Sequence, residues 1–349
     1  GDKHCSKYLT QKGNKMFIEL ISNYGLFLLK TLTVVISILV ILSFAINSKK
    51  SKSEGDLEVT NVNEELAGLE ENIKKNILAN SDFKKFIKSR KKNKKVLDKR
   101  LFILDFKGNI KASEIVSLRR EISGVLLSFK KGDEVLLRLE NSGGTVHEHG
   151  LAASQLKRIK DKKIPLTICV DKVAASGGYM MACVANKIIS SPFAIVGSIG
   201  VLAQVPNFNK LLKSKGIDFE QHTAGNYKRT VTMFGENTDK DREKLGEQLE
   251  DIHVLFKDFI VSQRKDIDIE KVATGEYWYG KSALALNLVD QIMTSDEYIL
   301  SMRDKFSIVR VKYKPSTTFA DKISKVSSKL SKKVFNDLSQ KNHDDSIFK

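Results

Sequence analysis

Residues 174–180 read Ala-Ala-Ser-Gly-Gly-Tyr-Met, a turn of small residues that carries one serine, Ser176, and opens into an apolar run ending at Ala185. A serine beside glycines at the start of a helix has an uncrowded hydroxyl. The first backbone N–H groups of that helix have no internal partner and can face a developing negative charge. The stretch therefore suits a nucleophilic serine. Its commoner interpretation is a helix cap followed by a tight turn, so the rest of the chain must decide between the two.

A second glycine pair follows the apolar run Val135–Leu139, in the segment Glu140-Asn141-Ser142-Gly143-Gly144-Thr145-Val146. Two glycines at the end of a strand let the backbone turn sharply and aim its N–H groups into a site, as an oxyanion hole requires. An isolated glycine pair is more often an ordinary turn. Gly143 and Gly144 are therefore candidate oxyanion donors if Ser176 lies nearby.

Two further segments could assist a nucleophilic serine. Residues 224–229 read Ala-Gly-Asn-Tyr-Lys-Arg and hold Lys228. A serine hydroxyl needs a proton acceptor, and a lysine kept neutral by burial can be one. Residues 196–201 read Val-Gly-Ser-Ile-Gly-Val and hold Ser198, whose hydroxyl could bind the amine of a buried lysine. Taken separately, the first segment holds an ordinary solvated lysine and the second reads as a strand with a bulge.

The other reactive side chains give no compelling site. None of the six histidines has a spacing that requires a metal; His147 and His149 come nearest, and we expect them in an exposed loop. A Ser-His-Asp triad using His147 or His222 stays open. Cys169 and Cys183 lie in apolar surroundings, and the odd total of three cysteines argues against a disulfide framework. Without a phosphate-binding loop or dinucleotide fingerprint, we expect no cofactor and no metal.

Tyr24–Ile46 is an apolar stretch interrupted only by Lys30. As a helix it is about 34 Å long, enough to cross a hydrocarbon core of about 30 Å, and Lys30 could snorkel to the interface. The stretch is too long for a cleavable signal peptide, and residues 46–50 offer no small-residue cleavage site. We expect a membrane anchor at 24–46. Residues 1–23 are expected to form an N-terminal extension, in which Met16 is a candidate start.

The formal charge of +17 is concentrated in blocks. Residues 54–71 carry seven acids and neither Lys nor Arg, whereas residues 84–100 carry ten Lys or Arg and one Asp. Such blocks are typical of solvated segments. The basic block fits a membrane surface better than nucleic acid, because no aromatic interleaving or reader motif accompanies it. We expect residues 47–99 to form a charged linker or stalk.

From Leu101 onward, strand-type apolar runs alternate with segments of helical spacing. The strand-type runs are Leu101–Phe106, Val135–Leu139 and Ile164–Val170, and the helical segments are 112–128 and 150–160. This alternation predicts βαβ units and a buried, mostly parallel sheet in an α/β domain at 100–300. A long amphipathic helix is predicted at 239–265. A basic C-terminal tail at 301–349 contains helical spacing at 319–338, which could lie on a membrane or pack on a sister subunit.

Taken together, these segments resemble the signal peptide peptidase A family of membrane-anchored Ser/Lys proteases, in particular its single-domain branch. The matching text is ENSGGTV at 140–146, AASGGYM at 174–180, GSIGV at 197–201, GNYKRT at 225–230 and TGEYWYGKSALALNLVD at 274–290. The resemblance covers residues 100 to 300, and the anchor and charged linker also fit the pattern. Several ordered motifs with an anchor make it specific.

The resemblance implies a role for each candidate. The nucleophile would be Ser176, and the base would be Lys228, which follows it at the family's separation of 228 − 176 = 52 residues. Ser198 would orient the lysine. The oxyanion donors would be the backbone N–H of Gly143 or Gly144 and that of Gly177. This chain departs from its relatives at Ser142, where they often have proline.

The resemblance also implies a ClpP/crotonase-like fold, assembly into a homo-oligomeric ring, and acyl-enzyme hydrolysis of signal peptides or unfolded membrane-proximal segments. It suggests the periplasmic side of a bacterial inner membrane, whereas the basic block after the anchor favours the cytoplasmic side. Two alternatives stay open. One is an acyl-CoA enzyme of crotonase type, which would leave Ser176 and Lys228 unexplained; the other is a catalytically decayed membrane scaffold of the same fold.

Overall fold

The computed structural model describes residues 24–42, 55–92, 97–108 and 114–316. The chain divides into two compact units, one made of residues 1–55 with 315–349 and the other of Asp56–Lys314. The expected extension at 1–23, the last residues of the expected anchor and the expected tail helix at 319–338 lie outside the described residues.

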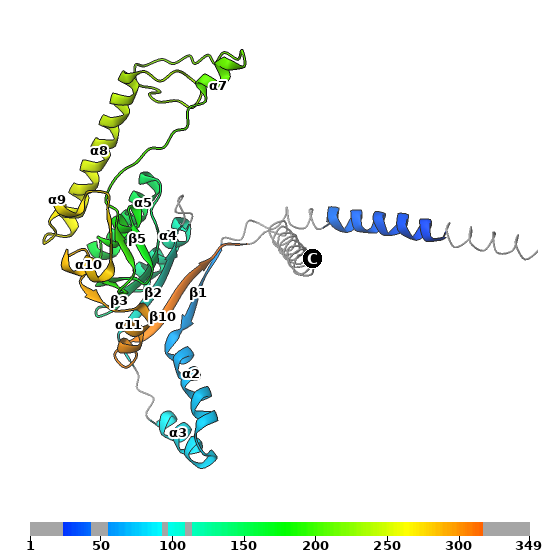
Figure 1. Cartoon of the computed structure of the whole chain (residues 1–349). Helices are drawn as coiled ribbons and strands as arrows, with labels where there is room; N and C mark the ends of the chain where they lie inside the picture. Colours follow the sequence, from blue (N-terminus) through cyan, green and yellow to red (C-terminus); the bar gives the residue numbers. More distant parts are fainter. Residues whose placement is uncertain (1–23, 43–54, 93–96, 109–113, 317–349) are drawn as a thin grey trace, which may run out of the picture. The chain divides into compact units, whose positions relative to one another are not determined.

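The first unit contains the helix Tyr24–Leu42, blue in Figure 1. Its 19 residues have a mean hydropathy of 2.5, so by length and composition it could cross a membrane. Its hydroxyls donate to carbonyls one turn earlier, Thr31 to Phe27 and Ser37 to Thr33, both at 2.8 Å. Such bonds satisfy polar groups that hydrocarbon could not solvate. The helix is compatible with the expected anchor.

The second unit is built on a seven-stranded sheet, in the spatial order β1 (Asp56–Asn61), β10 (Ser307–Lys314), β2 (Arg100–Lys107), β3 (Glu134–Glu140), β4 (Leu166–Val170), β6 (Lys187–Ser190) and β9 (Gln291–Ile292). Its neighbouring strands are parallel except at one edge, where β1 runs antiparallel to β10. The central strands β2, β3 and β4 are the apolar runs of the sequence, and they are largely buried, as expected for a parallel sheet covered on both faces. The predicted α/β fold with a parallel sheet is confirmed.

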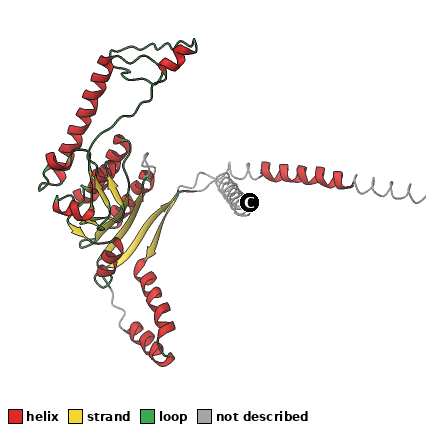
Figure 2. Ribbon diagram, in the orientation of Figure 1, coloured by secondary structure: helices red, strands yellow, loops and turns green. Residues whose placement is uncertain are grey.

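Helices cover both faces of the sheet (Figure 2). They are α2 (Val62–Ile77), α4 (Ile115–Ser128), α5 (Val146–Asp161) and α11 (Ser295–Met302). Alternate residues of β2 enter two hydrophobic clusters: Phe102, Leu104 and Phe106 join α4 and α5, while Leu101 and Ile103 join α2 and α11. The helices predicted at 112–128 and 150–160 correspond to α4 and α5. Shorter or peripheral helices are α3 (Asn80–Lys92), α9 (Ile269–Val272) and α10 (Gly280–Ala285).

A second, three-stranded sheet consists of β5 (Val173–Ala175), β7 (Ile195–Gly197) and β8 (Tyr277–Tyr279). β5 is parallel to β7, which is antiparallel to β8. An isolated bridge between Asn141 and Ala174 joins this sheet to the segment after β3. The ends of β3, β5 and β7 therefore meet at one place.

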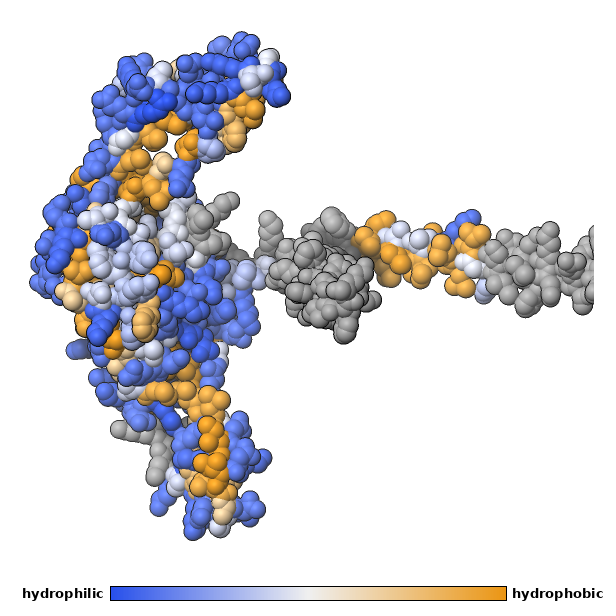
Figure 3. Space-filling model, in the orientation of Figure 1, coloured by the Kyte–Doolittle hydropathy of each residue, from blue (hydrophilic) through white to orange (hydrophobic). Residues whose placement is uncertain are grey.

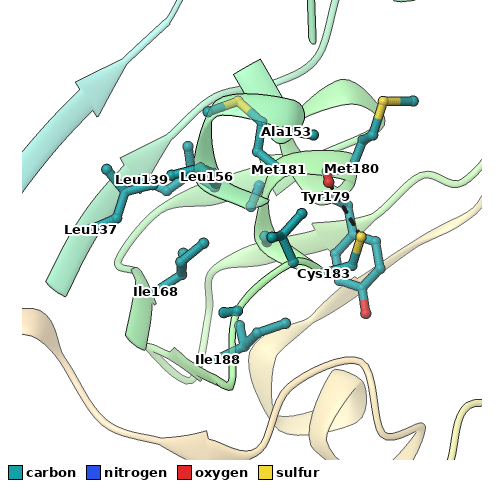
Figure 4. Close-up of a cluster of buried hydrophobic side chains, with 14 of the residues drawn as sticks. Leu137, Leu139, Ala153, Leu156, Ile168, Tyr179, Met180, Met181, Cys183 and Ile188 are labelled. Atoms are coloured by element: carbon teal, nitrogen blue, oxygen red, sulfur yellow. Dashed lines mark hydrogen bonds between the residues drawn. The ribbon is translucent and has the colours of Figure 1, made fainter. Parts of the chain in front are cut away.

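Helix α6 (Gly177–Ala182) follows β5 and is buried along its whole length. Figure 4 shows Tyr179, Met181 and Cys183 among the apolar side chains of the larger cluster. The Tyr179 hydroxyl donates to the Leu288 carbonyl at 2.9 Å. The start of α6 thus rests on a rigid core.

Residues 56–92 differ from the expected charged linker. β1 pairs with β10 over six residues, and Asn63, one residue into α2, accepts a hydrogen bond from the Ile308 N–H at 2.6 Å. The compact unit accordingly runs from Asp56 to Lys314 rather than from 100 to 300. The partners of β1 come from the opposite end of the unit, so local composition does not reveal them.

Residues 201–238 form an arm that connects Gly200 to α8 (Asp239–Gln263) and contains one short helix, α7 (Asn209–Ser214). Figure 1 shows α7 beyond the N-terminal end of α8. The long helix predicted at 239–265 corresponds to α8, which begins with a capping box between Thr238 and Asp241. Only Phe256 and Ile260 of α8 are buried, so it packs on the core near its C-terminal end.

Candidate active site

Three chain segments meet around Ser176 through backbone hydrogen bonds. The Asn141 N–H donates to the Val173 carbonyl at 2.9 Å, and the Ala175 N–H donates to the Asn141 carbonyl at 3.1 Å. The Ser176 N–H donates to the Gly197 carbonyl at 2.7 Å. The structure therefore brings together the glycine pair after β3, the serine turn and the segment that holds Ser198.

Ser176 occupies a sharp turn between β5 and α6. Its backbone angles are φ 53° and ψ −119°, a region that side-chain-bearing residues rarely adopt. Its side chain makes no capping hydrogen bond to the helix that follows. Ser176 thus stands at the N-cap position of α6, but its side chain does not cap the helix. Strain of this kind costs about 1–3 kcal/mol and is typical of functional turns.

Gly143 lies directly against the serine. A Cβ added at Gly143 would lie 2.7 Å from the Ser176 Cβ and 3.2 Å from the Gly177 nitrogen, and its φ is +94°. Both the space and the backbone angle therefore require glycine. The Gly143 N–H donates to the Asn141 side-chain oxygen at 2.8 Å, so it is already engaged.

Ser198 follows β7 next to the serine turn. The register pairs Ala175 with Gly197, which places Ser176 and Ser198 one residue beyond the same ladder position. Ser198 also has a positive φ, 52°, and its N–H donates to the Glu276 carbonyl at 2.7 Å. Two strained serines thus lie at the ends of adjacent parallel strands.

Lys228 is placed apart from this cluster. It lies in the arm with its side chain exposed, in a turn closed by its N–H and the Gly225 carbonyl at 3.2 Å. The ring of the preceding Tyr227 lies 5.0 Å from the Lys244 ammonium, near the start of α8. Ile252, which lies beside Ser176, is eight residues farther along that helix, or about 12 Å. This arrangement does not bring Lys228 to Ser176.

A pocket of ≈ 20 Å³ lies beside the serine. Its walls include Gly144 and Gly177, the apolar side chains of Met180 and Phe256, and Ile252 of α8. The site is therefore a mostly apolar notch between the serine turn and α8. A larger cavity of ≈ 310 Å³ elsewhere is lined by Lys160, Arg264 and Asp290 and holds none of the predicted residues.

The two cysteines within the described residues, Cys169 and Cys183, are not alternative nucleophiles. Burial raises the pKa of the Cys183 thiol to about 12 and that of the Cys169 thiol further still. Both thiols are free, and thiols held protonated in a core are inert. Among the described residues, no group of three or more His, Cys, Asp or Glu side chains could hold a metal ion.

The histidine pair differs from the expected exposed loop. His147 and His149 both lie in α5, where His147 is exposed and His149 is 0% exposed. His222 lies in the arm, exposed, within 3.4 Å of Glu220. The exposed-loop expectation is wrong for His149. The burial of His149 could have been predicted from the helical spacing of Ala152, Ala153, Leu156 and Ile159, which puts position 149 on the same buried face.

His149 and Asn141 are the site residues that the sequence left without a role. The His149 ring lies within 2.9 Å of the Thr145 carbonyl through Nδ1 and within 3.0 Å of the Asn141 side-chain oxygen through Nε2. A Cβ added at Gly177 would overlap the His149 ring. Both side chains therefore lie directly behind the serine turn.

Two protein-family models match most of the chain: Peptidase family S49 N-terminal at residues 19–156 and Peptidase family S49 at 158–308. "Probable protease SohB" of Buchnera aphidicola subsp. Schlechtendalia chinensis is 48% identical over 308 residues, covering 81% of this chain and 100% of its own. "Probable protease SohB" of Haemophilus influenzae is 45% identical over 319 residues, covering 86% and 90%. A solved structure of a membrane-bound stomatin-specific protease is 13% identical with a TM-score of 0.40, covering 59% of this chain and 85% of its own.

Proposed function

The chain belongs to peptidase family S49 and is a serine peptidase, and on that premise we propose that it is a membrane-anchored endopeptidase with a Ser176/Lys228 dyad. The observation that carries the proposal is the backbone of Ser176. Ser176 lies between a strand and a buried helix with strained backbone angles and no side-chain capping bond, and it lines the adjacent pocket. Gly143 approaches it so closely that a Cβ there would lie 2.7 Å from the Ser176 Cβ. Strain at that position is useful to a nucleophile and serves no purpose in a helix cap.

Gly144 and Gly177 are the proposed oxyanion donors. The Gly143 N–H is engaged by Asn141, whereas Gly144 and Gly177 both line the pocket beside Ser176. Gly177 is the first residue of α6, so its N–H has no partner within the helix. This assignment selects Gly144 from the pair that the sequence left open.

The proposed reaction is acyl transfer. Lys228 takes the Ser176 proton, and the serine oxygen attacks the substrate carbonyl to give a tetrahedral intermediate held by the two backbone N–H groups. The lysine then returns the proton to the leaving amine as the peptide bond breaks. The same lysine then takes a proton from water as the water attacks the acyl carbonyl, and it gives that proton to the Ser176 oxygen as the acyl–serine bond breaks and the carboxylic acid product leaves. Ser198, beside Ser176, would hold the lysine amine in place.

The base must reach the serine for this chemistry. Lys228 lies on an exposed arm near the start of α8, away from the pocket. We propose that assembly into a homo-oligomeric ring supplies it, with the arm of one copy delivering Lys228 to the Ser176 pocket of its neighbour. The large apolar side chains exposed on the arm support such a contact.

We propose membrane-released signal peptides or unfolded membrane-proximal segments as the substrate class, and the periplasmic side of the inner membrane as the location. The apolar helix at 24–42 supports anchoring, and the apolar side chains of Met180, Ile252 and Phe256 beside Ser176 suit an apolar peptide. Protease added to intact spheroplasts should degrade the catalytic unit. Protection of the unit until the membrane is lysed would place it in the cytoplasm instead.

The test of the dyad is peptide hydrolysis by the full chain in detergent. We expect Ser176→Ala and Lys228→Ala each to lower kcat at least about 10³-fold, because nucleophile and base act as one unit. Lys215→Ala, which removes another exposed lysine of the arm, should leave cleavage unchanged. Equal cleavage by wild type and both dyad variants would overturn the proposal.

The same preparations separate the alternatives. An acyl-CoA enzyme of crotonase type would turn over a CoA thioester and leave peptides intact. A decayed scaffold would cleave neither substrate.

A further inference from the structure

Asn141 and His149 form a buried polar pair behind the serine turn that the proposed mechanism does not use. Asn141 is 1% exposed and His149 is 0% exposed. Buried polar side chains cost free energy unless their hydrogen bonds are made, so a pair of this kind at an active site needs a reason.

Backbone hydrogen bonds hold Asn141 in place, and its side chain in turn holds the neighbouring glycine pair. Its N–H and carbonyl bond to Val173 and Ala175, the strand that leads into Ser176. Its side-chain oxygen accepts the Gly143 N–H at 2.8 Å. One residue thus ties the glycine pair to the strand of the nucleophile.

The hydrogen bonds determine which group donates to which. The Gly143 N–H can only donate, so the oxygen of the Asn141 amide, and not its nitrogen, must face it. The His149 Nε2 lies 3.0 Å from the same oxygen. Because that oxygen can only accept, the contact is a hydrogen bond when His149 carries its hydrogen on Nε2, and this is the tautomer that we assign. The other ring nitrogen faces the Thr145 carbonyl at 2.9 Å.

This arrangement leaves His149 without a free nitrogen for Ser176. Each ring nitrogen already faces an oxygen acceptor, so the ring has no lone pair directed at the serine hydroxyl. A Ser-His-Asp triad through His149 is therefore excluded by its contacts. The ring instead packs against Gly177, which follows the nucleophile.

We infer that His149 is a positioning residue. This inference rests on the proposed function of the serine site. Its Nε2–H holds the Asn141 oxygen, Asn141 holds the Gly143 N–H, and the turn so fixed aims the Gly144 N–H into the pocket. The ring also supports Gly177, so both proposed oxyanion donors depend on one buried histidine. Donors act most strongly when they are held in place before charge develops.

The experiment compares two substitutions of nearly equal size in the full chain in detergent. In His149→Gln the side-chain amide reaches the position of Nε2 and can still donate to Asn141. In His149→Asn the amide reaches only the position of Nδ1, near Thr145, and the bond to Asn141 is lost. Both lose the ring, so a packing defect affects both.

We expect His149→Asn to lower kcat on the order of 30-fold with KM within about twofold, below the 10²–10³-fold cost of deleting an oxyanion donor outright. His149→Gln should restore kcat to within about fivefold of wild type, whereas His147→Gln, on the exposed face of α5, should change neither constant. Equal kcat losses in the Gln and Asn variants would assign His149 to packing alone and overturn the inference. So would an Asn variant with wild-type kcat.

Hydrogen exchange provides a readout that needs no catalysis. Amide exchange in residues 140–146 should be faster in His149→Asn than in His149→Gln by about tenfold, because only the Asn variant releases the turn. Equal exchange rates in the two variants would contradict the inference. Absence of Ser176-dependent cleavage in wild type together with the expected exchange difference would overturn the proposed function and leave the positioning contact established.

Discussion

Gly177 and Gly178 hold the serine turn in contact with two different groups of the site. A Cβ at Gly177 would overlap the His149 ring, and a Cβ at Gly178 would overlap the Asn141 carbonyl oxygen. Neither glycine has a positive φ, so close approach and not backbone freedom requires them. At the residue scale, the turn tolerates side chains only at Ser176 itself.

Gly178→Ala should therefore destabilise the chain, because the methyl group meets backbone that is fixed by two hydrogen bonds. We expect a loss of about 2 kcal/mol or more, measured as a lower midpoint of thermal unfolding, together with reduced peptide cleavage. Gly150→Ala in α5 is the matched control. Its Cβ would meet open space, so alanine should stabilise that helix by about 0.5–1 kcal/mol. Equal unfolding midpoints for the two variants would contradict the contact.

The sequence allowed the serine, the glycine pairs and Ser198 to be named as a possible site, because each lies in a distinctive turn. It could not show that Asn141 and His149 connect them. An asparagine beside a glycine pair reads as a turn residue, and the helical spacing that places His149 on a buried face does not show which group its ring contacts. Their roles arise only where β3, β5 and α5 pack together, which is a property of tertiary structure.

At the scale of elements, α4 is attached to β10, the strand next to the edge strand β1, by a buried carboxyl. The Glu121 carboxyl, 4% exposed, accepts the Tyr313 N–H at 2.8 Å, and its other oxygen has no hydrogen-bond partner among the described residues. Burial raises its pKa from 4.5 to about 7, and nearby Asp105 adds to the rise while the Tyr313 N–H opposes it. The protonated form is the one that suits this site.

This carboxyl predicts a fall in stability with rising pH. The folded chain binds the Glu121 proton more tightly than the unfolded chain does, so its stabilising contribution is complete below pH 4.5 and is lost as pH rises through about 7. The change amounts to about 3 kcal/mol across that window. Glu121→Gln keeps an oxygen for the Tyr313 N–H and removes the titration. The midpoint of thermal unfolding should fall from pH 5 to pH 8 less in the variant than in wild type; parallel curves would refute the assignment.

The same region shows why parts of the fold escaped the sequence. β2, β3 and β4 were predicted because a buried parallel strand is a continuous apolar run. β1 is mostly exposed and its apolar character is weak, so local sequence does not reveal its backbone pairing with β10. β5, β7 and β8 have three residues each, too short for a periodic signal.

At the scale of the whole molecule, the arm at 201–238 exposes more apolar surface than a solvated loop needs. Its exposed large side chains are Leu202, Val205, Phe208, Leu211, Ile217, Phe219, Tyr227, Met233 and Phe234. Figure 3 shows apolar surface on this part of the molecule. Phe234 contacts both Phe208 and Phe219, so the arm has a small cluster of its own and little contact with the core. A surface of this kind fits a protein partner. If that partner is a second copy of the chain, its Ser176 would also need a base, which Lys228 of this arm would supply.

Complementation between inactive copies tests whether the base comes from a neighbour. Ser176→Ala retains Lys228, and Lys228→Ala retains Ser176, so each variant alone lacks a working site. In a ring where Ser176 of one copy faces Lys228 of the next, a 1:1 mixture has a serine-intact copy beside a lysine-intact neighbour with a probability of one half times one half. Co-expressed copies should therefore recover about a quarter of wild-type cleavage.

A mixture of Ser176→Ala with the double variant Ser176→Ala/Lys228→Ala is the control, because it contains no nucleophile and must stay at background. Within-chain delivery of Lys228, by an arm that folds back onto its own pocket, predicts background activity for the complementing mixture as well. The recovered fraction thus distinguishes the two routes directly. A ring in which neighbouring arms complete the sites would also make cleavage depend on assembly, since a separated copy would hold a strained serine with no base.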